Sequence, residues 1–434
     1  MTRRAEETKR DPGALLAEAE ALDARDPLAP LRAQFALPRD AAGQELTYLC
    51  GHSLGLAPLA ARQYVNEELS DWERLGVAGH HTARRPWIGY AEQLRDGMAQ
   101  LAGAQAGEVV AMNSLTVNLH LLLASFYQPV GKRCRIVIEA GAFPSDRHAV
   151  VSQILWHGLD PATTLLEVAP PPGEDLLDEE QLEVLLDDEG GEIALVLWPG
   201  VQYLTGQSFD LPRIAAAAAR NGARCGFDLA HAIGNTTLAL HDSGADFAVW
   251  CGYKYLNGGP GALAGAFVHS RHARSSLPRL SGWWGNDPAT RFQMQPDFQP
   301  APGAAGWQVS NPPILSAAPL LASLALFEAA GAAPLQAKAR TLTGWLDARL
   351  RRDFAGSIDV ITPAAPAARG SQLSLRFRGG NDVGRSAFDA LTRHGIVADW
   401  REPDVIRVAP VPLYNRYTDA ARLLLYLDQV LERA

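Results

Sequence analysis

Apolar and polar residues at the start of the chain follow the spacing of amphipathic helices. This spacing predicts a helical arm over residues 13–35 and further helices over 59–75 and 91–103. The Arg- and His-rich segment Gly79–Trp87 separates the last two and is expected to be a loop. The chain is therefore expected to open with a helical region.

After Asn113 the pattern changes to short, β-branched apolar runs that alternate with helical stretches. This alternation predicts an α/β fold, with a mostly parallel sheet covered by helices on both faces. The expected strands are Arg135–Glu139, Glu192–Trp198, Ala223–Asp228, Phe247–Cys251 and Leu263–His269.

The last third of the chain departs from this alternation. One helix over residues 314–351 is expected to leave the sheet region, and residues 358–434 are expected to form a small α+β unit. The unit is expected to contain strands near Gln372–Arg378 and Val405–Ala409 and a final helix from Thr418.

We expect three segments with different places in the fold. Residues 1–70 form an N-terminal helical arm and part of a small domain, and residues 71–325 form the large domain. Residues 326–434 complete the small domain at the C-terminus. The small domain is thus expected to be built from both ends of the chain.

Composition and charge narrow the class of protein. The 434 residues are 47% hydrophobic and 20% charged, which is ordinary for globular proteins and excludes disordered and fibrous classes. The formal net charge of −9 argues against nucleic-acid binding, which requires a positively charged surface.

Three features of the sequence bear on localisation. No stretch has the roughly 20 apolar residues of a membrane-spanning helix, and residues 1–30 lack the apolar segment of a secretory signal. The four cysteines are far apart and show no CxxC spacing, so we interpret them as reduced, packed thiols. A cytoplasmic protein is expected.

The strongest chemical signal lies at the ends of two successive predicted strands. Asp228 ends one strand, and Lys254, preceded by Tyr253, follows the next. Ligands of open α/β sheets bind at the carboxyl ends of strands. Pyridoxal phosphate (PLP) chemistry needs a lysine amine to hold the aldehyde and a carboxylate to keep the pyridine nitrogen protonated. Each residue alone also has an ordinary explanation, as a solvated lysine or a helix cap.

Three further segments carry candidate binding groups. Asn113–Thr116 opens an apolar helical run, so it either meets an anion through backbone N–H groups or is a plain N-cap. Phe143, followed by Asp146, lies after a strand end, where its ring stacks on a flat cofactor or packs into the core. Arg407, in an apolar strand, either has a structural partner or grips a carboxylate.

Other kinds of site find little support in the sequence. Asp228 and His231 have no Cys, His or carboxylate partners at metal-ligand spacing, so no metal site is expected. Gly258–Gly261 lacks the Lys-Ser/Thr of a P-loop and does not fit GxGxxG. The sequence also contains no GxSxG motif of a serine hydrolase.

Longer blocks of the sequence resemble the kynureninase family of PLP enzymes, which has the aspartate-aminotransferase-like fold, PLP fold type I. The resemblance runs from about Tyr48 to about Tyr414. It includes the runs YLCGHSLGLAP, MNSLTVNLHLLLASFY, AFPSDRHAV, GFDLAHAIGN, YKYLNGGPG, GWWG, SNPPIL and IRVAPVPLYN. It implies hydrolytic Cβ–Cγ cleavage of L-kynurenine or 3-hydroxy-L-kynurenine to anthranilate or 3-hydroxyanthranilate plus L-alanine, in tryptophan catabolism by the kynurenine pathway, which is linked to NAD biosynthesis.

The same resemblance implies a role for each candidate residue. Lys254 would hold the cofactor and move the substrate α-proton, Asp228 would pair with the pyridine nitrogen, and Tyr253 would act as an acid or base. Arg407 would bind the substrate α-carboxylate. The remaining cofactor contacts would come from Leu115, Thr116, Phe143, Asp146, His231, Trp283 and Asn311.

The family's active site lies between the subunits of a homodimer, and Trp283 and Asn311 are candidates for residues that the other subunit supplies. His80, Ser310 and Asn311 would line the aryl end of the substrate pocket. Polar groups there recognise a ring hydroxyl, so this set implies a preference for 3-hydroxykynurenine. His80 has an alternative role as a plain loop residue.

One position departs from the family pattern. Pro199 stands where relatives carry Ser or Thr, and because proline donates no hydrogen bond, a cofactor contact is lost there.

Three alternatives to the kynureninase function stay open: an aminotransferase, a cysteine desulfurase or a PLP-binding scaffold without activity. Cys225 and Cys251 lie in predicted strands, which disfavours the mobile cysteine of a desulfurase.

Overall fold

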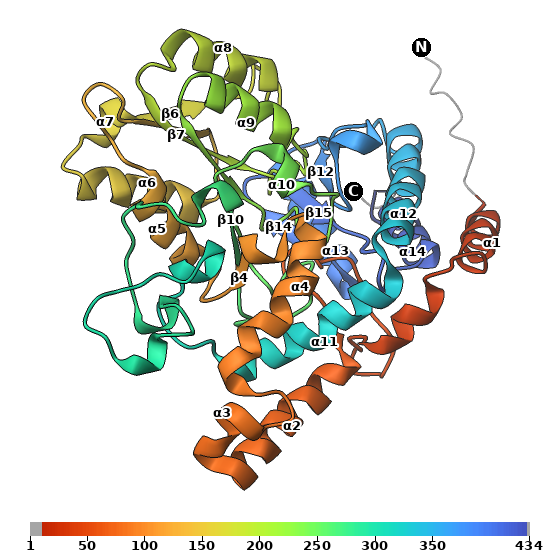
Figure 1. Ribbon diagram of the computed structural model, residues 1–434. Coiled ribbons are helices and arrows are strands. Elements are labelled where there is room, and N and C mark those ends of the chain that lie inside the picture. Colours follow the sequence, from red (N-terminus) through yellow and green to blue (C-terminus); the bar gives the residue numbers. More distant parts are fainter. Residues whose placement is uncertain (1–10, 432–434) are drawn as a thin grey trace.

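Two sheets organise the chain in the computed structural model, which describes residues 11–431 (Figure 1). Residues 1–10, which belong to the predicted 1–70 segment and to the stretch examined for a signal, lie outside the described residues. The larger sheet and its helices make up one side of the molecule in this view, and the C-terminal unit lies beside them.

The larger sheet has seven strands in the order β4-β10-β9-β8-β7-β5-β6. The strands from β9 to β6 run parallel, and β10 is antiparallel to both its neighbours, so the prediction of a mostly parallel sheet is confirmed. The strands are β4 (Val109–Ala111), β5 (Arg135–Glu139), β6 (Leu165–Val168), β7 (Ile193–Pro199), β8 (Arg224–Asp228), β9 (Phe247–Trp250) and β10 (Gly265–Val268). The five predicted strands are all present, whereas β4 and β6 were not predicted.

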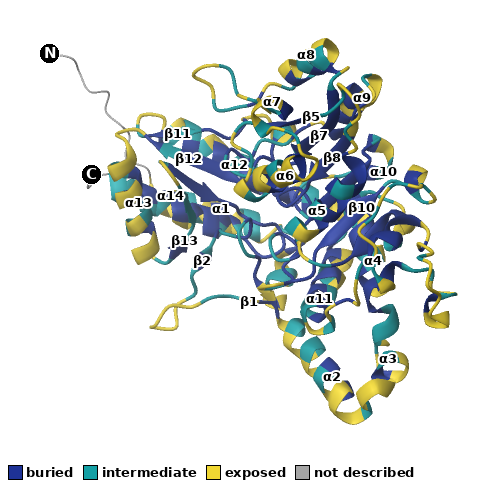
Figure 2. Cartoon of the chain, turned by 90° about the vertical axis from the view of Figure 1, so that its left-hand side faces the viewer, coloured by how far each residue is buried: buried dark blue, intermediate teal, exposed yellow. Residues whose placement is uncertain are grey.

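Helices bury both faces of this sheet, which explains why its strands are almost continuously apolar. Ile136 of β5 faces a core built with α5 and α6, whereas Val137 faces a core built with α4, α8, α9 and α11. The helices are α4 (Tyr90–Ala102), α5 (Leu115–Phe126), α6 (Pro144–Trp156), α7 (Pro161–Thr164), α8 (Glu179–Glu189), α9 (Leu211–Arg220), α10 (Leu240–Ser243) and α11 (Ile314–Ala330). Figure 2 shows the strands as the buried centre of the molecule.

The smaller sheet is antiparallel, in the order β11-β12-β15-β14. Its strands are β11 (Ile358–Val360), β12 (Leu373–Phe377), β14 (Asp399–Arg401) and β15 (Val405–Val408). A third hydrophobic core packs it against α12 (Ala332–Asp353), α13 (Asn381–Arg393) and α14 (Tyr417–Leu431).

The N-terminal region joins this C-terminal unit. Helix α1 (Pro12–Asp23) packs on α14, and β2 (Thr47–Tyr48) pairs in parallel with β13 (Ile396–Val397). Strand β1 (Phe35–Ala36) pairs with β3 (Ala57–Pro58), after which α2 (Leu59–Leu75) packs against α11. The N-terminal and C-terminal segments that the structure describes therefore meet beside the smaller sheet. The hairpin of α2 and α3 (Gly79–Thr82) projects from the body in Figure 2.

Two helix predictions and one loop prediction were wrong in detail. The helix predicted over 314–351 is broken at Gly331, whose φ of 74° is a conformation that residues with a Cβ rarely adopt, so α11 and α12 meet at 84°. The arm over 13–35 continues after α1 as a separate 3-10 helix, Ala29–Gln34. The expected loop Gly79–Trp87 contains α3.

Within residues 11–431, no single helix has the length and apolar composition needed to cross a membrane. The sharply bent pair α11 and α12 meets those two criteria only when its helices are taken together.

Candidate active site

A cavity of about 180 Å³ lies at the carboxyl ends of β5, β7, β8 and β9. This is the edge at which open α/β sheets bind their ligands. The cavity brings together these residues predicted from the sequence: Leu115, Thr116, Phe143, Asp146, Asp228, His231, Tyr253 and Lys254. It also contains Pro199 and, not anticipated from the sequence, Glu139, Ser145, Val201, Tyr203 and Ala230.

Asp228 and Lys254 are placed by the ends of neighbouring strands. Asp228 is the last residue of β8 and is buried, and its carboxylate accepts a hydrogen bond from the backbone N–H of Ala230 at 2.6 Å. Lys254 follows β9, and its Nζ lies 5.6 Å from the centre of the Phe143 ring. Phe143 in turn meets Tyr203 edge-on at 5.3 Å. An amine, a carboxylate and an aromatic face thus border one cavity.

Three carboxyl groups share this cavity. Burial raises the pKa of Glu139 to about 8. Burial, reinforced by the neighbouring Asp228, raises the pKa of Asp146 well above its usual range. Burial also raises the pKa of Asp228, against the opposing effect of its hydrogen bonds and of Lys254. A further positive charge placed here would stabilise the ionised form of all three carboxyl groups and lower their pKa values. A protonated ring nitrogen is such a charge.

His231 adds an unused hydrogen-bonding atom to the site. Its ring is buried, and Nδ1 has no hydrogen-bond partner among the described residues. Burial, with the positive charge of Lys254, lowers the pKa of His231 well below its ordinary value, so the ring is neutral. Buried polar atoms are normally paired, so an unpaired nitrogen on a residue that lines a cavity indicates a ligand contact.

The N-terminus of α5 supplies an anion site at the same cavity. The helix begins at Leu115, and its N-cap residue Ser114 makes no side-chain hydrogen bond to the first turn. The first N–H groups of a helix lack partners within the helix and carry its positive dipole end. Leu115 and Thr116, which line the cavity, therefore lie where a phosphate group binds favourably. Together with Lys254 and the carboxyl groups, this arrangement fits PLP.

Five of the predicted residues are not brought to this cavity by the single chain. Trp283, Ser310 and Asn311 are exposed, and His80 packs edge-on against Trp87 at 5.4 Å. Arg407 is buried in the smaller sheet, where it donates to the backbone oxygen of Tyr203 at 2.6 Å and forms an ion pair with Asp399. Their roles in the site stay predictions.

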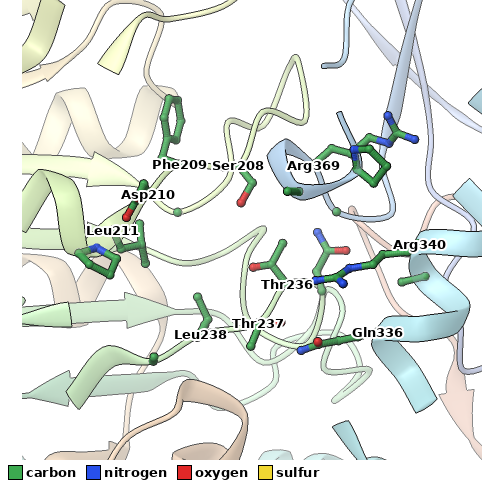
Figure 3. Close-up of a pocket in the computed structure, with 18 of the residues that line it drawn as sticks. Ser208, Phe209, Asp210, Leu211, Thr236, Thr237, Leu238, Gln336, Arg340 and Arg369 are labelled. Carbon is green, nitrogen blue, oxygen red and sulfur yellow. The ribbon is translucent and has the colours of Figure 1, made fainter. Parts of the chain in front are cut away.

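A second cavity, of about 300 Å³, is shown in Figure 3 and shares no lining residue with the first. It is bordered by the 235–239 segment and α12, and the Arg340 side chain points into it in this view. The described residues that line it include no lysine, and their polar groups are mostly hydroxyls and amides. It therefore lacks the amine that the first cavity has.

Sheet order and site together define a class of protein: PLP enzymes of fold type I. Solved structures with this fold are similar over nearly the whole chain. A C-DES variant with glycine covalently linked to its PLP cofactor matches with a TM-score of 0.76 and 19% identity, covering 92% of this chain and 99% of that one. The cysteine desulfurase CsdA from Escherichia coli matches with a TM-score of 0.75 and 18% identity, covering 94% and 98%.

The chain belongs to the kynureninase family. It is 55% identical over 410 residues to a kynureninase of Xanthomonas campestris pv. campestris (strain B100), covering 94% of this chain and 96% of the relative. It is 56% identical over 403 residues to a kynureninase of Xanthomonas oryzae pv. oryzae (strain PXO99A), covering 93% and 95%. The family model of the kynureninase C-terminal domain matches residues 335–427. The family resemblance of the sequence blocks is confirmed.

Proposed function

We propose that the protein has kynureninase activity with PLP as its cofactor. It hydrolyses the Cβ–Cγ bond of L-kynurenine or 3-hydroxy-L-kynurenine and releases L-alanine with anthranilate or 3-hydroxyanthranilate. The observation that carries the proposal is the cavity that joins Lys254, Asp228 and the N-terminus of α5. It occurs in a chain that is 55% identical to curated kynureninases over 94% of its length.

When bound, PLP supplies an electron sink for the carbanion that forms at the substrate α-carbon. Lys254 would hold the cofactor aldehyde through its Nζ and, as a free amine, would move the substrate α-proton. Asp228 would hold the proton on the ring nitrogen, because a cationic ring beside its buried carboxyl group favours the ionised form against the effect of burial. Phe143 supports the ring, and Leu115, Thr116, Asp146, His231, Trp283 and Asn311 complete the cofactor contacts.

Tyr253 is the proposed proton donor to the γ-carbonyl oxygen of the substrate as water adds to the γ-carbon. Burial, with the neighbouring Cys251, raises the pKa of its hydroxyl above the ordinary value. The hydroxyl therefore keeps its proton at neutral pH and can give it to an oxygen that gains charge. Tyr253 lines the same cavity as Lys254, so both groups can act on one substrate.

A homodimer with shared active sites accounts for Trp283, Ser310 and Asn311, three of the predicted residues that the single chain leaves outside the cavity. Trp283 is 42% exposed, Phe292 is 56% exposed and Met294 is 73% exposed, all within one short segment. Apolar side chains gathered in this way favour coverage by a second chain. In the proposed dimer this segment, with Ser310 and Asn311, reaches the partner's cavity.

The domain division and cellular role are proposed on the same basis. Residues 71–325 form the large PLP-binding domain, and residues 1–70 and 326–434 form the small domain. The pairing of β2 with β13 and the packing of α1 on α14 support that division. The enzyme acts in the cytoplasm, in tryptophan catabolism by the kynurenine pathway, and its hydroxylated product links it to NAD biosynthesis.

The activity is tested by product release from purified PLP-loaded protein offered L-kynurenine and 3-hydroxy-L-kynurenine in parallel. Anthranilate or 3-hydroxyanthranilate should appear with an equal amount of alanine. Product that appears only when a keto acid is supplied would identify an aminotransferase instead. Bound cofactor without any turnover would favour the scaffold.

We expect 3-hydroxykynurenine to have the higher kcat/KM. Asn311→Ala should reduce that preference by about tenfold, because one good hydrogen bond to the ring hydroxyl contributes about 1.4 kcal/mol. The measurement is the ratio of kcat/KM for the two substrates in wild type and variant. Asn381→Ala, at the start of α13 in the smaller domain, is the matched control and should leave the ratio unchanged. An unchanged ratio in Asn311→Ala would remove Asn311 from the aryl pocket.

We expect Pro199→Ser to tighten PLP binding. Pro199 ends β7 and lines the cavity, and a serine hydroxyl at this position adds a donor that proline lacks. A single added hydrogen bond corresponds to about a two- to tenfold lower Kd. Equilibrium dialysis of the apoprotein against PLP measures the change, with Pro172→Ser in an exposed loop as the control. Equal or weaker binding by Pro199→Ser would contradict the expectation.

A further inference from the structure

Arg407, the proposed ligand of the substrate carboxylate, is inaccessible in this structure. Its residue exposure is 1%, and it does not line the cavity that contains Lys254. Tyr203, which does line the cavity, accepts a hydrogen bond from Arg407 through its backbone oxygen. The guanidinium Nε is buried and has no hydrogen-bond partner among the described residues. A carboxylate can reach Arg407 only after a neighbouring group moves.

Asp399 is the residue that pairs with the Arg407 guanidinium. The two residues lie directly across from each other on the antiparallel strands β14 and β15, and they form an ion pair. One carboxylate oxygen of Asp399 also meets Arg401 at 3.1 Å. Burial opposes the ionisation of Asp399, but His52 and Arg407 outweigh it and hold its pKa below the usual range. Asp399 thus presents to Arg407 the same anionic group that an amino-acid substrate carries.

His52 offers this carboxylate a second partner. Its Nε2 lies 3.3 Å from the same Asp399 oxygen, yet neither ring nitrogen makes a hydrogen bond to any described residue. The ring is fully buried, 6.3 Å from that of His231. A short rotation of the Asp399 side chain would align the contact, and Asp399 lies in an edge strand of the smaller sheet.

The charges around His52 favour a neutral ring before substrate arrives. Asp399 and Cys50 lie close to its ring nitrogens, the charges of Arg407 and Lys254 act on the ring, and His231 lies next to it. Arg401 meets Asp399. Burial, followed by the charge of Arg407, lowers the pKa of His52 to about 4. Two arginines meet the same Asp399 oxygen, which disfavours a cation among Cys50, His52 and Asp399. The cluster is therefore better suited to exchanging a carboxylate than to holding a metal.

We propose that Asp399 occupies Arg407 in place of the substrate carboxylate, that substrate displaces it, and that the displaced Asp399 then accepts a hydrogen bond from His52. Asp399 and His52 act through Arg407, so they are positioning residues. This inference rests on the proposed function, because Arg407 is the proposed carboxylate ligand. It makes the site selective: a compound without a carboxylate cannot break the Asp399–Arg407 ion pair.

The test uses a ligand that has the carboxylate and aryl ketone of the substrate but no amine. Binding of 3-benzoylpropanoate to PLP-loaded protein is measured by calorimetry, with butyrophenone as the matched ligand without a carboxylate. Asp399→Asn should bind 3-benzoylpropanoate about tenfold more tightly. This factor is expected if the Asp399–Arg407 ion pair is formed in about nine-tenths of the wild-type molecules, so that only about one-tenth can bind the ligand. His52→Leu should bind it more weakly, and His52→Gln, which keeps an N–H donor, should restore part of the affinity.

Controls separate this outcome from general effects. Asp359→Asn, in an exposed pair with Arg378 on the same sheet, should not change the affinity, and butyrophenone should bind all variants alike. Thermal unfolding of each variant shows whether it is folded. If Asp399→Asn binds 3-benzoylpropanoate equally or more weakly, Asp399 only holds Arg407 in place and the inference is wrong. Kynurenine turnover by the wild type tests the proposed function separately, because that result does not depend on Asp399.

Discussion

Lys254→Ala protein is expected to release neither anthranilate from L-kynurenine nor 3-hydroxyanthranilate from 3-hydroxy-L-kynurenine above background. The variant loses the amine that holds the cofactor and moves the α-proton, and general acid–base catalysis alone accounts for about 10² to 10⁴ in rate. We therefore expect a loss of at least about a thousandfold in kcat. The product-release assay measures it, and absorbance of the bound cofactor reports whether PLP is still present.

Lys132→Ala is the matched control, because Lys132 is an exposed lysine in a loop before β5. This variant should keep the activity of the wild type. Appreciable turnover by Lys254→Ala with PLP bound would refute the role assigned to Lys254. Absence of both turnover and cofactor would call for a second measurement at saturating PLP, where the loss should persist.

Asp228→Asn is expected to lower kcat/KM by about two to three orders of magnitude. The substitution keeps the shape of the side chain but removes the charge that holds the proton on the ring nitrogen. Removing one partner of a buried ion pair costs about 3–5 kcal/mol. Steady-state kinetics at saturating PLP give the rate effect, and dialysis of PLP gives the affinity, which should fall as well.

Asp210→Asn tests whether the effect is specific to the site. Asp210 caps α9 and is exposed, and asparagine is an equally good N-cap, so stability and activity should be unchanged. Wild-type activity in Asp228→Asn would mean that another carboxyl group holds the ring proton. Asp146, which lines the same cavity, would then be the residue to replace next.

The sequence predicted the parts of the site that lie beside strand ends. Asp228 ends one short apolar run rich in strand-forming residues and Lys254 follows the next, and parallel strands place their carboxyl ends at one edge. The N-terminus of α5 was equally visible, because Asn113–Thr116 precedes a long apolar helix. These features depend on local patterns, which is why they could be predicted.

Features that depend on pairing between distant segments were missed. Asp399 opposes Arg407 only because β14 and β15 pair in one register, and His52 reaches them from the other end of the chain. Glu139 was taken for an ordinary strand residue. The break at Gly331 was missed because the flanking residues are alanine-rich and suit a helix; a glycine followed by Pro334 was the signal available.

The three carboxyl groups at the cavity also affect how the protein should be handled. Glu139 has an ordinary pKa of 4.5 and a folded-state pKa of about 8, so the folded protein binds more protons than the unfolded chain between these values. Stability contributed by this group is present at low pH and is lost as the pH rises through that window. A bound cationic ring compensates the charge that then appears. Loading with cofactor is therefore expected to raise the melting temperature of the protein most in buffers at or above the pKa of Glu139.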